Sequence, residues 1–123
     1  MKYPKTIEEM LKMDDVPVVA IDQQSIFTFI NAAFIKEYGW TLDDLLGKPV
    51  TEIMPEHMRS AHNVGFARFL TTESSVLLGK PLPLAVRYKN GTEKTATHFI
   101  LAENKDGLWR FAAIIDYPEH NGA

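Results

Sequence analysis

The stretch 82-LPLAVRYKNGTEKTATHFILAENKDGLWRFAAII-115 decides the fold class of this chain. Apolar residues alternate along its first part, as they do in a β-strand that buries one face. Asn90-Gly91 and Asp106-Gly107 separate the apolar runs, and both dipeptides favour the tight turns of β-hairpins. The stretch therefore predicts three consecutive antiparallel strands.

Two further strands and several helices are predicted upstream of these three strands. The runs VPVVAID (16–22) and SIFTFIN (25–31) flank two glutamines and predict a first hairpin. Amphipathic or capped patterns then predict short helices within 32–40 and 41–50, and a longer one within 54–73. The order predicts an α+β fold, with a five-stranded antiparallel sheet and short helices on one face.

The first thirteen residues predict an additional amphipathic helix. KTIEEMLKM (5–13) places Glu9 three residues after Thr6, which is the spacing of a capping box. We therefore divide the chain into an N-terminal helix (1–13), one globular domain (14–119) and a tail (120–123).

Composition narrows the classes of function. The net charge is −3 and the lysines and arginines are scattered, so we expect no nucleic-acid partner. The chain has no cysteine and no apolar run of roughly 18 residues, which favours a cytoplasmic protein without a membrane span. We expect no catalytic activity, because Ser60 and His62 fall on different faces of the predicted helix and the paired aspartates diverge.

His62 is the residue that most needs an explanation. At helical spacing it shares a face with Met58, Gly65, Phe66 and Phe69, so its ring is expected to point inward among apolar neighbours. A buried imidazole needs a hydrogen bond, a metal or a cofactor for its nitrogens. One interpretation is a core histidine bonded to a carbonyl or carboxylate, and the other is a ligand.

The order of the motifs resembles that of PAS domains. VVAIDQQSIFTFINAAFIKEYGW resembles the PAS opening, in which an asparagine, here Asn31, starts a helix after the strand pair. LLGKPVTEIMPE, VRYKNGTEK and AAIIDYPE are similar to later PAS motifs in the same order. The resemblance covers about residues 14 to 119 and implies a PAS fold, which is a fold of sensory modules with various ligands or none.

The helix at 54–73 is similar to that of the oxygen-sensing haem PAS kinases of the FixL type. The resemblance implies that His62 is the axial ligand of a haem b and that Arg68 contacts a propionate. The residues predicted to bind the cofactor are His62, Arg68, Met58, Phe66, Phe69, Leu77, His98 and Ile100. Leu78, Phe99 and Leu101 are further candidates for the wall formed by the strands.

The sequence departs from that family on the distal side of the predicted haem. Leu82 falls on the position of the arginine that holds bound oxygen, and Val76 on that of a second propionate contact. We hypothesise that His98 takes over as a distal ligand of the iron or as a donor to a bound gas. The other interpretations are an outward-facing His98 on its strand and a surface role for Arg68.

Two functions remain open at this stage. The first is a sensory module, for example of a two-component system, that binds haem through His62, detects gas or redox state and signals to an output domain or partner. The second is a cofactor-free PAS module for dimerisation or docking, or one that binds another metabolite. For either function we expect a homodimer through the N-terminal helix and the outer sheet face, because both faces of the strand 108–115 are apolar enough for one to meet a partner.

Overall fold

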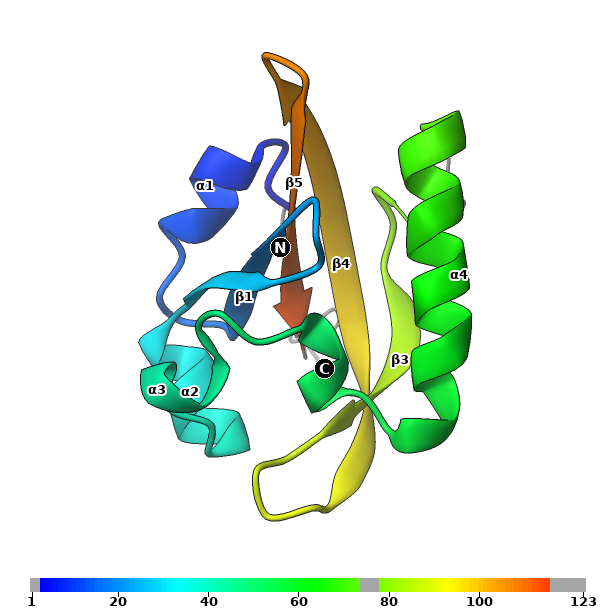
Figure 1. Cartoon of the computed structure of the whole chain (residues 1–123). Helices are drawn as coiled ribbons and strands as arrows, with labels where there is room; N and C mark the ends of the chain where they lie inside the picture. Colours follow the sequence, from blue (N-terminus) through cyan, green and yellow to red (C-terminus); the bar gives the residue numbers. More distant parts are fainter. Residues whose placement is uncertain (1–2, 74–77, 116–123) are drawn as a thin grey trace.

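The computed structural model describes residues 3–73 and 78–115. Its centre is a five-stranded antiparallel sheet with the strand order β2-β1-β5-β4-β3 (Figure 1). The strands are β1 (Val18–Asp22), β2 (Phe27–Ile30), β3 (Leu82–Arg87), β4 (Glu93–Lys105) and β5 (Leu108–Ile115). The predicted α+β class and the five-stranded antiparallel sheet are confirmed.

The two Gly-containing turns join the strands as predicted. Lys105 pairs with Leu108, and the two residues between them, Asp106 and Gly107, have φ of 56° and 85°. Positive φ at both positions is the requirement of a type I′ turn, which asparagine or aspartate before glycine satisfies. The β3–β4 connection is longer and spans residues 88–92, and only Gly91 of the Asn90-Gly91 pair has a positive φ.

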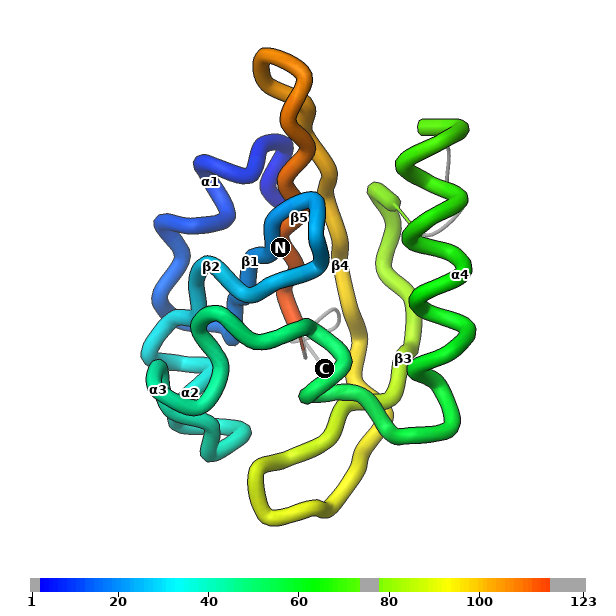
Figure 2. Tube along the Cα trace, viewed as in Figure 1, coloured from blue at the N-terminus to red at the C-terminus, as the bar shows by residue number. Residues whose placement is uncertain are grey.

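Within the described residues, three helices and a 3₁₀ turn lie on one face of the sheet. They are α2 (Ala32–Tyr38), α3 (Leu42–Leu45), η1 (Val50–Ile53) and α4 (Glu56–Thr72). The Asn31 side chain accepts from the amide of Phe34 at the start of α2, and Gly39 ends the helix with φ of 83°. Figure 2 shows the chain crossing from α3 through η1 to α4.

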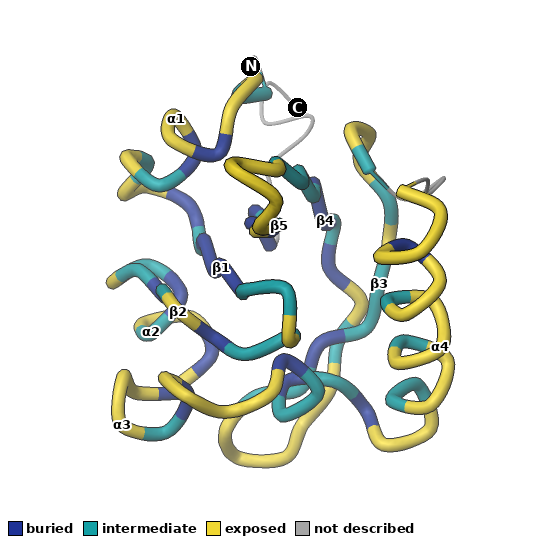
Figure 3. The backbone as a smooth tube through the Cα atoms, turned by 45° about the horizontal axis from the view of Figure 1, so that its top comes forward, coloured by how far each residue is buried: buried dark blue, intermediate teal, exposed yellow. Residues whose placement is uncertain are grey.

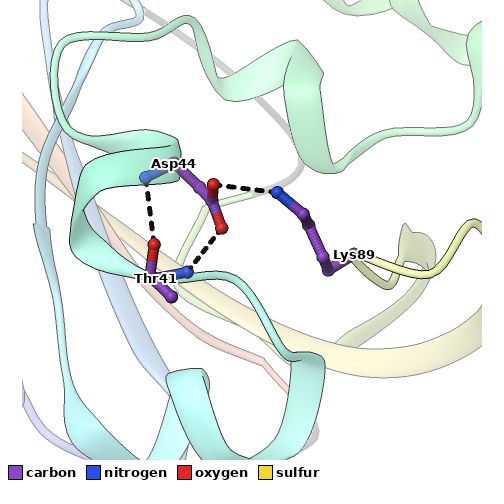
Figure 4. Close-up of polar contacts among 3 residues, drawn as sticks. All are labelled: Thr41, Asp44 and Lys89. Carbon is purple, nitrogen blue, oxygen red and sulfur yellow. Dashed lines mark hydrogen bonds and ion pairs between the residues drawn. The ribbon is translucent and has the colours of Figure 1, made fainter.

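A polar contact attaches α3 to the β3–β4 loop (Figure 4). Thr41 and Asp44 form a reciprocal capping box, and Lys89 Nζ lies 2.8 Å from Asp44 Oδ1. The hydrogen bond from Lys89, followed by that from the Thr41 backbone, lowers the pKa of Asp44 to about 2. Asp44 therefore stays ionised at neutral pH and holds the loop beside α3.

The N-terminal helix, α1 (Ile7–Leu11), covers the opposite face of the sheet. Thr6 caps it as predicted, since its hydroxyl accepts from the amide of Glu9 at 3.1 Å. Its buried Ile7 and Met10 belong to one cluster with Ala112 and Ile114 of β5. The apolar outer side of β5 is therefore covered by the chain itself. Our argument that this side meets a partner is wrong, and the predicted homodimer loses that support.

The main core lies between the sheet and the helices of the other face. Its largest buried side chains include Phe27, Phe34, Tyr38 and Leu45. Figure 3 shows β1 buried, whereas most of α4 is exposed. Phe69 is the one residue of α4 (56–72) that is buried. Within the described part of the chain, no helix has the length and apolar character that a membrane span requires.

Candidate functional site

An apolar cavity of about 340 Å³ separates α4 and η1 from the sheet. The residues of η1, of α4 and of the link between them that line it are Val50, Ile53, Met54, Met58, Ala61, His62, Gly65, Phe66 and Phe69. The remaining lining residues are Val19, Ala20, Ile21, Leu78, Leu84, Ala85, His98, Ile100, Phe111, Ala112, Ala113 and Ile115. His62 and His98 are the only residues with polar side chains among these described residues.

Small side chains leave this space open. Gly65 lies on the face of α4 that borders the cavity, and a Cβ added there would have no atom within 4 Å. Opposite, Ala113 of β5 presents only a methyl group. The cavity is open to solvent on its helical side, where Ala61 and Gly65 are exposed, and its volume lies within the ~300–1,000 Å³ range of small-molecule sites.

Aromatic rings hold the C-terminal half of α4 against β5. The rings of Phe69 and Trp109 are 4.8 Å apart, and those of Phe69 and Phe111 are 5.4 Å apart, both edge to face. Phe66 packs on Phe111 at 5.0 Å. Phe66, Phe69 and Phe111 also line the cavity, so the rings that fix where α4 meets the sheet form part of its wall.

His62 connects the middle of α4 to the β1–β2 turn. Its Nε2 lies 3.2 Å from Ser25 Oγ. The turn is itself fixed, because Asp22 Oδ1 accepts from the amides of Gln24 and Ile26 at 2.8 Å and 3.1 Å. The inward position predicted for His62 from helical spacing is thus observed. Its hydrogen-bond partner is a serine hydroxyl rather than the carbonyl or carboxylate we considered.

Burial lowers the pKa of His62 below its ordinary value of about 6.5. The folded chain therefore favours the neutral ring, and the stability that this provides is complete above pH 6.5. It is lost as the pH falls through about 6.5 toward the lower folded pKa, because the unfolded chain then binds the proton more readily.

We expect the melting temperature of the wild type to fall more between pH 7.5 and pH 5.5 than that of His62→Gln. The difference should be about 1–3 °C, because His62 is only half-buried. Circular dichroism melts of both proteins in one buffer series measure it. Equal pH slopes in the two proteins would show that His62 does not titrate differently in the folded and unfolded chains.

His98 lies on β4 and is buried, with 8% of its surface exposed. It pairs with Leu82 of β3 and Ile115 of β5 and lines the cavity. Its Nδ1 lies 2.9 Å from the carbonyl oxygen of Ala96. Our alternative interpretation of an outward-facing His98 is therefore wrong. Apolar residues occupy both faces of β4, so alternation alone did not show which way this side chain points.

The other predicted residues divide into four groups. Met58, Phe66, Phe69, Leu78 and Ile100 line the cavity as expected. Phe99 and Leu101, our further candidates for the strand wall, pack on the opposite face with α1 because successive strand residues alternate between faces. Leu77, like Val76, lies outside the described residues. Arg68 is exposed and does not line the cavity.

Sequence reasoning missed several residues of the cavity. Ser25 carried no signal beyond its place in a turn, since its contact with His62 joins positions 37 residues apart. Ala113 and Leu84 lay in predicted strands, but their place in the lining of the cavity depends on how α4 packs. No three His, Asp or Glu side chains are grouped as a metal site in residues 3–73 and 78–115.

These residues do not fit a haem in this conformation. The nitrogen that would bind iron, His62 Nε2, contacts Ser25, and Arg68 is not at the cavity for a propionate. The volume of about 340 Å³ is near the lower end of the ~300–1,000 Å³ range of small-molecule sites. A macrocycle with two carboxylates would require the walls to move and would find no cation among the described lining residues.

Comparison with solved structures identifies the fold, whereas neither family models nor curated proteins gave a match. The PAS domain of an HTR-like protein from Haloarcula marismortui is 20% identical, with a TM-score of 0.66 over 89% of this chain and 86% of that chain. A PAS domain from Colwellia psychrerythraea is 12% identical, with a TM-score of 0.69 over 93% and 98%. A LOV protein from Rhodobacter sphaeroides is 11% identical, with a TM-score of 0.63 over 94% and 68%. The chain therefore has the PAS fold, as its motifs predicted.

Proposed function

We propose that this chain is a sensory input module that binds a small, largely apolar molecule between α4 and the sheet. Binding would then be signalled to an output domain or a partner protein. The observation that carries the proposal is the cavity, which lies in an otherwise well-packed domain. Its lining is apolar with two polar side chains, which is the usual character of small-molecule sites.

The size of the cavity favours a ligand of about two fused rings. An apolar protein cavity of about 150 Å³ is known to hold one benzene molecule. The cavity here is about 340 Å³ and offers roughly twice that space. Filling it would bring α4 and the sheet into contact through the ligand, and the packing gained would stabilise the domain.

The position of α4 supports a role in signalling. Outside its aromatic contacts with β5, the helix is mostly exposed, and the contact of His62 with Ser25 joins its middle to the β1–β2 turn. A segment with few buried contacts opens more readily than the core, and a ligand that binds only the closed form shifts that equilibrium. Occupancy of the cavity would therefore reduce the opening of α4, and this change can be read by a partner.

Benzothiophene, a neutral two-ring aromatic, is a suitable first probe. We expect it to shift the amide resonances of α4, β4 and β5 in a saturable manner and to slow hydrogen exchange in α4. Ala113→Phe should abolish both effects, because the larger side chain fills the cavity from β5. Ala67→Phe is the matched control, since Ala67 is exposed on α4 and does not line the cavity.

Absence of any saturable shift in the wild type would reject the proposal. Haemin is titrated in parallel, because the resemblance to haem PAS kinases predicts a ligand role for His62. A saturable Soret band that His62→Ala removes would replace the proposed ligand with haem. A broad spectrum that is the same in both proteins would leave the small-ligand proposal in place.

A further inference from the structure

We infer that the ligand is a hydrophobic monocarboxylate, with its apolar body in the cavity and its carboxylate on the side of the cavity that is open to solvent. This inference rests on the proposed function and defines the class of ligand for the same site. Three features carry it: the apolar interior, the exposed edge of the lining on α4, and the excess of positive charge beside that edge.

The interior of the cavity suits an apolar body and not a charged group. No lysine, arginine, aspartate or glutamate is among the described residues that line it. The rings of Phe66, Phe69 and Phe111 form part of the wall, and aromatic ligands pack on such rings in offset or edge-to-face contacts. A carboxylate in this interior would lose its hydration without gaining an ion pair, so a charged ligand has to keep that group outside.

The exposed part of the lining shows where such a group reaches water. Ala61 and Gly65 line the cavity and are nevertheless exposed, and they lie one turn apart on α4. His62 and Phe66 lie on the other edge of the helix, where they contact the β1–β2 turn and β5. The edge with Ala61 and Gly65 therefore faces β3, which runs beside α4 in Figures 1 and 3. We call this open edge the mouth of the cavity.

Arg68 borders the mouth. It follows Gly65 by three residues and Ala61 by seven, so the three residues share one side of α4. Helical side chains point back toward the N-terminus of their helix, which directs that of Arg68 toward the turn that carries Gly65. Arg68 is exposed and does not line the cavity. It is therefore placed to meet a group at the mouth rather than one in the interior.

The stretch that forms both sides of the mouth is strongly positive. Residues 57–92, which contain most of α4 and all of β3, include five lysines and arginines and one acid, Glu73, a formal charge of +4. The whole chain has a net charge of −3, so this stretch differs in sign from the rest of the molecule. A local excess of positive charge attracts anions and repels cations.

Two of these five cations are available to a ligand. Lys89 pairs with an aspartate of α3, and Arg59 and Arg87 donate to backbone carbonyls. Arg68 and Lys80 are exposed, and within residues 3–73 and 78–115 their side chains form no ion pair or hydrogen bond. Lys80 lies in the segment that leads from the lining into β3. A carboxylate at the mouth would thus have a cation on each side.

The test compares two probes of the same shape in calorimetric titrations at low salt. 2-Naphthoate carries a carboxylate, and 2-naphthamide replaces it with a neutral amide. We expect naphthoate to bind the wild type about tenfold more tightly, because an exposed ion pair contributes up to about fivefold and two cations act together. In about 0.5 M sodium chloride the two affinities should converge, since salt screens exposed charges. The Nε–H resonance of Arg68 should move with naphthoate and not with naphthamide.

Charge variants locate the carboxylate. Arg68→Gln and Lys80→Gln should each lower the preference for naphthoate about threefold, and Arg68→Glu should abolish it. Lys36→Gln is the matched control, because it removes one positive charge from an exposed position on α2, away from the mouth. It should leave the preference unchanged. The salt series on the wild type does not depend on how the variants fold.

Failure of this inference differs from failure of the proposed function. If naphthamide binds and naphthoate binds equally or more weakly, the carboxylate class is wrong and the sensory cavity stands. A preference that is the same in Arg68→Glu as in the wild type would overturn the position of the carboxylate at the mouth. If no probe binds the wild type, both the inference and the proposed function are wrong.

Discussion

Replacing Phe34 by alanine is expected to lower the free energy of unfolding by about 3–5 kcal/mol. Phe34 is fully buried in α2, where its ring packs on that of Tyr38 at 5.0 Å in the main core. Truncation would leave a cavity among side chains that the sheet and α2 hold in place, so the void would not collapse. Chemical denaturation monitored by circular dichroism measures the loss.

Phe66→Ala is the matched control for this effect. Phe66 is only half-buried and already borders the open space beneath α4, so its ring has fewer neighbours to lose. We expect Phe66→Ala to lower the free energy of unfolding by less than about 1.5 kcal/mol. It should also weaken the binding of aromatic probes. Equal losses for Phe34→Ala and Phe66→Ala would mean that the cavity is closed in solution and that α4 packs directly on the sheet.

Much of the fold could be predicted because its signals are local. Asp106-Gly107 prescribes a turn by its backbone preferences alone, and it forms that turn between β4 and β5. Asn31 and Gly39 delimit α2 in the same way, through a side-chain cap and a left-handed residue. Helical spacing was also enough to predict that His62 faces the sheet.

The site could be predicted only in part, because its geometry depends on packing between distant segments. Both faces of β4 carry apolar residues, so the sequence does not show which residues face the helices. Phe99 and Leu101 were therefore assigned to the wrong face, and the direction of the His98 side chain could not be predicted. The partner of His62 comes from the β1–β2 turn, and no local pattern pairs it with α4. A sequence also does not show how much space small residues leave between a helix and a sheet. Gly65 and Ala113 leave room for the cavity only because α4 packs over β5.

Asn31→Ala is the second substitution for which we expect a large effect, a loss of about 2–4 kcal/mol in the free energy of unfolding. The Asn31 side chain forms four hydrogen bonds. Its Oδ1 accepts from the amides of Phe34 and Val18 at 2.9 Å and 3.0 Å. Its Nδ2 donates to the carbonyl oxygens of Val16 and Met13 at 2.8 Å and 3.1 Å. One residue thus caps α2, starts β1 and fixes the segment that leads from α1 into the sheet.

Thr41→Ala separates the effect of losing a helix cap from the effect of losing the other hydrogen bonds that Asn31 forms. Thr41 caps α3 through bonds to Asp44 alone, at an exposed position, so its loss should cost only about 1 kcal/mol. The larger effect of Asn31→Ala would come from partly buried backbone groups of Val16 and Val18 that lose their partner without gaining water. Hydrogen exchange of the Val18 amide should rise in Asn31→Ala more than global unfolding explains. If Asn31→Ala costs no more than Thr41→Ala, Asn31 acts as a helix cap alone, and the tie between the N-terminal segment and the sheet is carried by the packing of α1.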